Sequence, residues 1–288
     1  MRRRLTNSLF VLPALLMSIA FFLVPLGQSF WISLHDWPVL GEAQFLGLGN
    51  YKELLGDRYF WDSLWFTTKY TLIVTPMIFI TAFILASLVR QDLPFVGVFR
   101  SAYFIPVVLS MIAASTMWSW IYNDQYGILN FLLMKMHLIS KPVVWMAKPK
   151  LSLPAVCIMV TWKTAGFNML ILLSGLQSIP EEIYEAASVD GASRWQKIWR
   201  ITLPLLRPTL GLALVVSVIG SYLAFDQFFV MTRGGPCNQT TPVVYWIYNT
   251  SFAYFRQGYG SAMSFVLLAI LVALSILQMR ILRKQYDY

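Results

Sequence analysis

Charged residues are scarce in this chain of 288 residues, where they make up 12% of the total. Soluble domains usually carry about 25% charged and about 45–50% apolar residues. Here 58% of the residues are hydrophobic, and the mean hydropathy is +0.62. An ordinary soluble domain is therefore excluded.

Residues that bind metals or carry out catalysis are also few. Two histidines and two cysteines lack the spacing of a zinc site. Cys157 lies in an apolar segment and Cys237 in a loop, so we expect neither a disulfide nor a metal site. The chain has no Gly-x4-Gly-Lys-Ser/Thr loop for nucleotide phosphates. A membrane-embedded enzyme, such as a lipid-modifying transferase, would need clustered acids, whereas Asp36, Glu42, Asp57 and Asp62 are scattered. The sequence therefore does not favour an enzyme.

Long apolar segments dominate what is present. A membrane helix needs about 20 apolar residues to cross a hydrocarbon core of about 30 Å. Six segments meet this length: residues 9–34, 69–88, 103–121, 154–175, 206–231 and 262–282. The alternating segments of about ten residues that mark a β-barrel are absent. We expect an all-α membrane protein with six transmembrane helices in a single domain, residues 1–288.

The net charge of +9 is spread along the chain, so membrane orientation explains it better than a nucleic-acid partner. With both termini in the cytoplasm, twelve lysines and arginines lie inside, among them Arg2, Arg3 and Arg4, against eight outside. The first apolar run exceeds a signal-peptide core and is followed by no small-x-small site, so we expect it to be retained.

The connection between the fourth and fifth segments, residues 178–204, is the most informative part of the chain, and we call it the coupling loop. Ser178 and Glu181 indicate a capped helix start, with Pro180 tolerated in the first turn. Gly191 predicts the end of this helix in the left-handed conformation. A second short helix is expected over residues 193–202. A polar pair of helices held between membrane spans suits docking to a soluble partner.

The pattern Glu185-Ala186-Ala187, Gly191 and Ile201-Thr202-Leu203-Pro204 resembles the EAA loop of ATP-binding-cassette (ABC) importer permeases. The wider chain is similar to the sugar-uptake branch of that family, the maltose and glycerol-3-phosphate type. The further matching motifs are Gly47-Leu48-Gly49-Asn50-Tyr51, Phe60-Trp61, Phe99-Arg100-Ser101-Ala102-Tyr103-Phe104-Ile105-Pro106, Leu176-Gln177-Ser178-Ile179-Pro180 and Thr232-Arg233-Gly234-Gly235-Pro236. The resemblance covers residues 10–282 and fits the six-span members.

This resemblance implies a type I importer permease in a bacterial or archaeal cytoplasmic membrane, with both termini cytoplasmic. It implies a second permease subunit, two ATP-binding subunits and an extracytoplasmic solute-binding protein as partners, in contact with membrane lipid. ATP and magnesium would be used by the ATP-binding subunits, and this chain would bind no cofactor. The residues implied in coupling to ATP hydrolysis are Glu185, Ala186, Ala187, Asp190, Gly191, Ile201, Leu203 and Pro204.

Ionisable residues inside membrane spans are candidates for function because their burial is costly. Lys163 and Asp226 qualify, in the two spans that flank the coupling loop, where the family places its sugar site. Aromatic faces and hydrogen-bonding groups around them suit a sugar ring. The candidate solute residues are Trp162, Lys163, Thr164, Phe167, Asn168, Tyr222, Asp226 and Gln227, with Phe229 nearby. Alternatively, Lys163 and Asp226 form a structural ion pair and the aromatic residues only pack.

Two other functions stay open at this point. Coupling loops recur across ABC importers, so the solute is alternatively an amino acid or phosphate. A channel acting alone is a third reading, which would leave the coupling loop without a purpose. The external-loop motifs and the Gly-Gly-Pro motif favour a carbohydrate, polyol or glycerophosphate.

Overall fold

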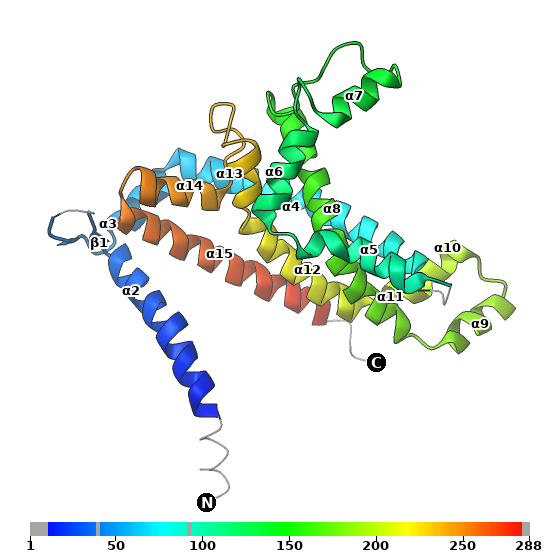
Figure 1. Ribbon diagram of the computed structural model, residues 1–288. Coiled ribbons are helices and arrows are strands. Elements are labelled where there is room, and N and C mark those ends of the chain that lie inside the picture. Colours follow the sequence, from blue (N-terminus) through cyan, green and yellow to red (C-terminus); the bar gives the residue numbers. More distant parts are fainter. Residues whose placement is uncertain (1–10, 39–40, 91–93, 284–288) are drawn as a thin grey trace, which may run out of the picture. The chain divides into compact units, whose positions relative to one another are not determined.

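The computed structural model describes residues 11–38, 41–90 and 94–283, which are mainly helical (Figure 1). In chain order the helices, with η for π-helices, are η1 (Ile19–Leu23), α2 (Val24–Ser33), α3 (Gly49–Gly56), α4 (Arg58–Leu88), α5 (Val96–Val108), α6 (Met111–Ile121), α7 (Ile128–Lys135), α8 (Pro149–Gln177), α9 (Glu181–Val189), α10 (Arg194–Lys197), η2 (Ile198–Thr202), α11 (Leu203–Leu205), α12 (Arg207–Tyr222), α13 (Asp226–Met231), α14 (Val243–Tyr248), η3 (Asn249–Ala253) and α15 (Gln257–Arg283). Strands β1 (His35–Asp36) and β2 (Gln44–Phe45) pair antiparallel.

The chain divides into two compact units. Unit 1 consists of Met1–Trp61 and Trp246–Ile270, and unit 2 of Asp62–Tyr245 and Leu271–Tyr288. Helices α4, α14 and α15 contribute residues to both units. The single membrane domain expected from the sequence stays a prediction. Arg2, Arg3 and Arg4, on which the predicted orientation partly depends, lie outside the described residues.

Five helices in the described part of the chain are long and apolar enough to cross a membrane. They are Val11–Ser33, Arg58–Leu88, Pro149–Gln177, Arg207–Met231 and Gln257–Ile281. These correspond to five of the six predicted spans. The second, fourth and sixth begin earlier than predicted, because the helix continues through less apolar residues that the hydropathy pattern leaves out.

The third predicted span, residues 103–121, is not one straight helix, which corrects the expectation. Helices α5 and α6 meet at an angle of 97°. Leu109 and Ser110 are extended at the break, with ψ of 144° and 152°. The Ser110 hydroxyl accepts a hydrogen bond from the Ala113 amide at 3.1 Å, so a new helix starts there with its own cap. The pair is a broken span or a re-entrant segment.

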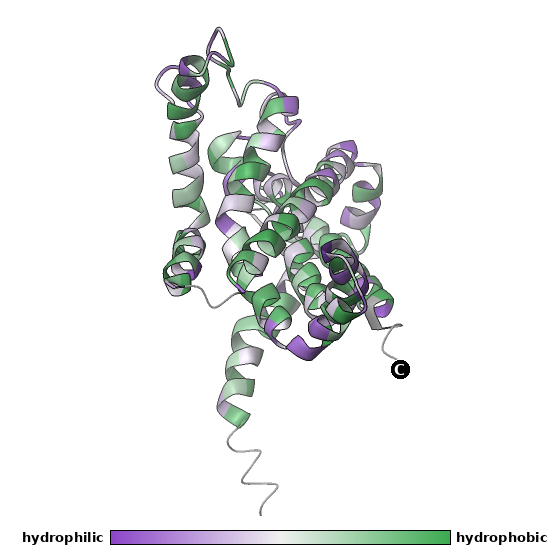
Figure 2. Cartoon of the chain, turned by 90° about the vertical axis from the view of Figure 1, so that its right-hand side faces the viewer, coloured by the Kyte–Doolittle hydropathy of each residue, from purple (hydrophilic) through white to green (hydrophobic). Residues whose placement is uncertain are grey.

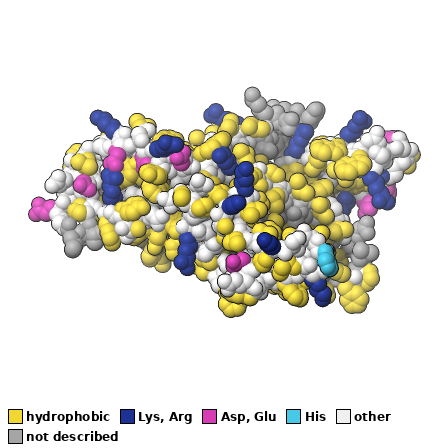
Figure 3. Space-filling view, turned by 90° about the horizontal axis from the view of Figure 1, so that it is seen from above, with side chains coloured by type: hydrophobic (Ala, Val, Ile, Leu, Met, Phe, Trp, Pro, Cys, Tyr) yellow, Lys and Arg dark blue, Asp and Glu magenta, His cyan; other side chains and the backbone are white. Residues whose placement is uncertain are grey.

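Side-chain chemistry follows the helices. Figure 2 shows that hydrophobic residues dominate the long helices and that hydrophilic residues gather mainly at helix ends and connections. On the face seen in Figure 3, lysines and arginines are dispersed among hydrophobic side chains. Soluble domains rarely expose apolar surface of this extent, so these helices require an apolar environment.

Two apolar clusters hold unit 2 together. In the first, Phe228 is fully buried and meets the rings of Phe66 and Tyr70 edge-on, at centroid distances of 5.3 and 5.1 Å. The second lies at the other end of α4 and α8 and includes Ala82, Ala86, Val89, Met169, Leu172, Leu176, Ile179 and Leu206. Its alanines let the helix backbones approach closely, a common device in membrane helix packing.

Unit 1 is organised around the end of α2. Asn50 lies in the first turn of α3 and is buried. Its side-chain amide donates to the carbonyls of Ser33 and His35, both at 2.9 Å, and the hydroxyls of Ser33 and Tyr51 lie 2.7 Å apart. The Gly-Leu-Gly-Asn-Tyr motif therefore fixes α3 to the end of the first span.

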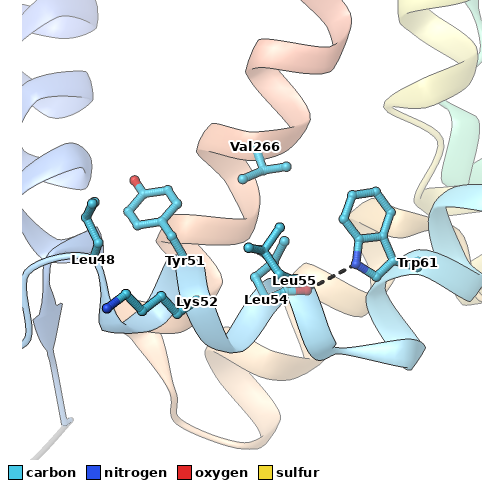
Figure 4. A pocket seen from close by; sticks show the side chains of 7 residues that line it. All are labelled: Leu48, Tyr51, Lys52, Leu54, Leu55, Trp61 and Val266. Atoms are coloured by element: carbon cyan, nitrogen blue, oxygen red, sulfur yellow. Dashed lines mark hydrogen bonds between the residues drawn. The ribbon is translucent and has the colours of Figure 1, made fainter.

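An ion pair and a hollow complete unit 1. Arg256 donates to both carboxylate oxygens of Glu53, at 2.8 and 2.6 Å, and this bidentate bond raises the pKa of Arg256. A hollow of about 280 Å³ lies between α3 and Val266 of α15, and Figure 4 shows the side chains that line it. Its walls are mainly apolar, and the Trp61 indole donates to the Leu54 carbonyl at 3.1 Å beside it.

The close approach of α5 and α8 predicts a specific sensitivity. A Cβ at Gly166 would overlap the Tyr103 carbonyl. We expect Gly166→Ala to destabilise the protein by about 1–3 kcal/mol, the usual cost of overpacking. The measurement is the midpoint of thermal unfolding in detergent. Gly220→Ala is the matched control, because a Cβ added at Gly220 would have nothing within 4 Å. Equal midpoints for the two variants would contradict the close approach.

Candidate functional site

The first helix of the coupling loop is α9, and its start differs from the prediction. Pro180 is the N-cap residue and no side chain caps the helix. The Ser178 hydroxyl donates backwards to the Gly175 carbonyl at 2.7 Å, so the predicted cap by Ser178 is wrong. The serine instead closes the last turn of α8. Glu181 and Glu182 still stabilise the first turn through the helix dipole.

The end of α9 is as predicted. Gly191 has a φ of +76°, in the left-handed region. The amide of Ala192 donates to the carbonyl of Ala187 at 2.9 Å, and the amide of Gly191 donates to the carbonyl of Ser188 at 3.1 Å. These two bonds define a Schellman motif, which turns the chain sharply without unsatisfied carbonyls.

The second helix is interrupted. It starts at Ser193 with a capping box. The Ser193 hydroxyl accepts from the Gln196 amide at 3.3 Å, and the Gln196 side-chain oxygen accepts from the Ser193 amide at 2.7 Å. It passes from α10 through the π-helix η2 to α11. Thr202 and Leu206 are buried, while Ile201, Leu203 and Pro204 are half-buried. The C-terminal part of the motif thus attaches the loop to the rest of unit 2.

The N-terminal part of the motif faces outward. Glu185, Ala186, Asp190 and Gly191 are exposed, and Ala187 is half-buried. A hollow of about 270 Å³ is lined by Asp190, Gly191, Ala192, Gln196, Arg200 and Ile201. The coupling residues therefore separate into an exposed set on α9 and a set that anchors the loop.

Sequence reasoning missed the most exposed large apolar residues of this loop. Val189, Trp195 and Trp199 are 88%, 70% and 65% exposed. The signal was present as large apolar side chains in a segment that is otherwise polar. Exposed tryptophans are costly in water and are enriched in interface hot spots. The loop therefore has the composition of a docking surface.

The candidate solute residues of α8 lie near the broken third span. The Lys163 ammonium donates to the Val107 carbonyl, the last turn of α5, at 3.4 Å. The indole of Trp162 lies 5.7 Å from that of Trp118 in α6, between ring centroids. Trp162 and Lys163 are half-buried. So is Thr164, whose hydroxyl donates to the Val160 carbonyl at 2.7 Å. Phe167 is 45% exposed.

Further along α8, Asn168 is buried and connects two helices. Its Oδ1 accepts from the Ser217 hydroxyl of α12 at 3.2 Å. Two candidates after it also have partners in the fold. The Tyr222 and Thr68 hydroxyls lie 3.0 Å apart, and the Gln227 amide donates to the Tyr70 hydroxyl at 3.2 Å. These contacts with α4 could not be derived from spacing along the chain.

Asp226 begins α13 and is half-buried. No ion pair joins it to Lys163, although the structure describes both side chains, so their predicted pairing as a structural alternative is not observed. Among the described residues, no group of three or more His, Cys, Asp or Glu side chains could hold a metal ion. Cys157 is a buried free thiol and Cys237 an exposed one.

Comparison with known proteins places these features in a family. The family model described as binding-protein-dependent transport system inner membrane component matches residues 60–286. The trehalose/maltose transport system permease protein MalF of Thermococcus litoralis is 34% identical over 283 residues, covering 97% of this chain and 94% of that protein. The lactose transport system permease protein LacF of Rhizobium radiobacter is 32% identical over 274 residues, which cover 94% of this chain and 91% of that protein.

A solved structure shares the fold. It is a bacterial alginate ABC transporter in complex with an alginate pentasaccharide-bound periplasmic protein. The TM-score is 0.81 at 20% identity, with 99% of this chain and 96% of that chain covered.

The geometry of Gly191 predicts how the loop responds to substitution. A left-handed residue other than glycine costs about 1–2 kcal/mol, so Gly191→Ala should open the Schellman motif about 5- to 30-fold more often. The measurement is the rate of hydrogen–deuterium exchange at the backbone amides of residues 191 and 192. Gly191→Asn should show a smaller increase, since asparagine tolerates this conformation better. Unchanged exchange in Gly191→Ala would rule out the motif.

Proposed function

We propose, from the premise that the chain belongs to the family of binding-protein-dependent transport system inner membrane components, that it is the permease subunit of an ABC importer for a carbohydrate. It is a multi-pass membrane protein with no enzymatic activity of its own. In this proposal it forms half of the translocation pathway, and a second permease forms the other half. The related solutes, polyols and glycerophosphates, belong to the same proposal.

The observation that carries the proposal is the coupling loop between two candidate spans. It exposes Glu185, Val189, Trp195 and Trp199 on short helices, while Thr202 and Leu206 anchor it. An exposed set on a rigid, anchored loop suits contact with a soluble subunit. We assign that subunit as an ATP-binding protein, because the chain has no phosphate loop of its own.

The remaining partners follow from the same assignment. Two ATP-binding subunits attach at the cytoplasmic side, where ATP and magnesium are used, and this chain holds no cofactor. An extracytoplasmic binding protein delivers the solute, as the likeness to the alginate transporter complex supports. The coupling loop and both termini then face the cytoplasm of a bacterial or archaeal cell.

A carbohydrate is favoured over other solutes. The matched permeases carry names for trehalose/maltose and lactose transport. Within unit 2, Trp162 and Trp118 lie close together beside Lys163. Aromatic rings complement the apolar faces of a sugar, and an ammonium group can donate to its hydroxyls. A permease for amino acids or phosphate is the alternative, and uptake of maltose, trehalose, sorbitol, glycerol 3-phosphate, an amino acid and phosphate into vesicles separates the two.

The coupling assignment predicts the effect of Glu185→Lys in the complete complex. A lost charge-assisted hydrogen bond costs about 1.5–3 kcal/mol, so uptake per ATP hydrolysed should fall about tenfold or more. Gly191→Pro should behave similarly, and both variants should remain in the membrane. The measurement is simultaneous ATP hydrolysis and uptake in reconstituted vesicles. Glu182→Lys, the same charge change on the same helix, is the control and should have a smaller effect.

A second measurement tests the partner directly. A cysteine at Val189 should crosslink to an ATP-binding subunit in a Cys237→Ser background, because that side chain is 88% exposed at the end of α9. Normal coupled uptake by Glu185→Lys together with no crosslink would overturn the assignment.

The solute assignment predicts the effect of Lys163→Ala and Asp226→Asn. Each should weaken the apparent affinity for the transported solute about tenfold, the cost of one hydrogen bond to a charged group. The measurement is the concentration dependence of uptake. Lys69→Ala is the matched control, since Lys69 is exposed and its ammonium lies over the Trp65 ring, 5.0 Å from the ring centroid. Unchanged affinity and rate in both variants would count against a lining role.

A further inference from the structure

The cytoplasmic end of α4 contacts the first helix of the coupling loop. The guanidinium carbon of Arg90 lies 4.5 Å from the centroid of the Tyr184 ring. This is cation–π geometry, in which a cation within about 6 Å of a ring centroid is attracted to the ring face. Arg90 and Tyr184 are both half-buried. The contact joins two segments that are far apart in the sequence.

Tyr184 is also joined to the second part of the loop. Its hydroxyl lies 3.0 Å from Thr202 Oγ1. The Thr202 hydroxyl donates to the Lys197 carbonyl at 3.2 Å, which uses its single hydrogen. The Tyr184 hydroxyl is therefore the donor to Thr202. The buried Thr202 stands in η2, one short helix before α12.

Few side chains other than Tyr184 attach α9 to the rest of unit 2. None of the residues of α9 is buried, and only Tyr184 and Ala187 are as much as half-buried. Tyr184 packs against the apolar cluster that includes Ile179 and Leu206. The orientation of α9 relative to the spans therefore depends strongly on this one side chain.

The α4 side of the contact is firmly held. Val89 is 3% exposed and belongs to the same apolar cluster. Its carbonyl accepts a hydrogen bond from Arg100 Nη2 at 2.7 Å, which ties the end of α4 to α5. Arg90 thus extends from a fixed point, and α9 cannot shift far from α4 without breaking the stack.

We propose that Arg90 and Tyr184 form a clamp that passes the displacement of α9 to α4 directly and to α12 through Thr202. They are positioning residues, since in this proposal neither contacts solute or nucleotide. The proposal rests on the proposed function, in which an ATP-binding subunit displaces α9. It adds a second route into the bundle beside the covalent connection of the loop to α8 and α12. Rigid transfer of this kind underlies hinge-like domain transitions.

The test measures whether α4 and α9 move as one body. Spin labels are placed at Ser87→Cys and Glu182→Cys, both exposed, in a Cys237→Ser background that keeps the buried Cys157. Distances between the two labels are measured by pulsed electron paramagnetic resonance in the permease assembled with its ATP-binding subunits. The measurement is made once without nucleotide and once with ATP and vanadate. The unaltered clamp should give one narrow distribution that nucleotide does not broaden.

Removing the cation should separate the two helices. Arg90→Ala should increase the population of separated distances about two- to fivefold, the range expected for a partly exposed cation–π contact. Arg90→Lys should restore part of the narrow distribution, because it keeps the charge. Arg280→Ala is the matched control, an exposed arginine in α15, and should leave the distribution unchanged.

Removing the hydroxyl bond should have a different signature. Tyr184→Phe keeps the ring stacked on Arg90 but loses the donor to Thr202. It should leave the distance distribution between the labels at positions 87 and 182 narrow. It should broaden a second distance distribution, measured between labels at Glu182→Cys and at Arg207→Cys in α12. Thr202→Val should do the same. A merely structural role for Tyr184 would broaden both distributions together, and that result would overturn the proposal.

Failure of the clamp and failure of the proposed function give different results. If the cysteine at Val189 crosslinks to an ATP-binding subunit while Arg90→Ala keeps the narrow distribution, the clamp is wrong and the function stands. If the Val189→Cys complex with an intact clamp forms no crosslink and Glu185→Lys keeps normal coupled uptake, the proposed function fails first, whatever the distances show.

Discussion

Hydrocarbon offers no hydrogen-bond partners, so every segment inside a bilayer must satisfy its own backbone. This constraint explains why the described chain is mostly helix, and why the breaks in its apolar segments come with replacement partners. At the α5–α6 break, Ser110 caps the new helix and the Lys163 ammonium donates to the Val107 carbonyl. In the coupling loop, the change to η2 keeps the backbone bonded while it shifts the register.

Much of this fold could be predicted from the sequence, because apolar length is a strong signal. Five spans and the end of α9 at Gly191 follow from run length and from glycine's freedom at positive φ. The 97° bend could not be predicted. Its cause is a two-residue change at Leu109 and Ser110 within an apolar run, where a serine is equally compatible with an unbroken membrane helix.

The candidate site was predictable only in part, for a related reason. The coupling loop carries its pattern within one continuous segment, so the motif could be recognised, whereas the division of its residues into an exposed and an anchoring set came from the structure. Contacts across the fold leave no such pattern. Spacing does not show that Asn168 would bond Ser217, nor that Arg90 would lie against Tyr184. The assignment of residues to solute therefore stays a prediction, while the same residues have definite partners in the fold.

The exposure of the coupling loop and its narrow attachment belong together. Val189, Trp195 and Trp199 would each gain from burial, at about 25 cal/mol per Å² of apolar surface, so a partner that covers them binds with useful energy. That energy can move the spans only if the loop does not yield first. The Schellman motif and the capping box make its two helices stiff, and Tyr184 connects α9 to the core. A loop with more buried contacts would hold more firmly but would offer less surface to a partner. A loop with fewer would be displaced without moving the helices behind it.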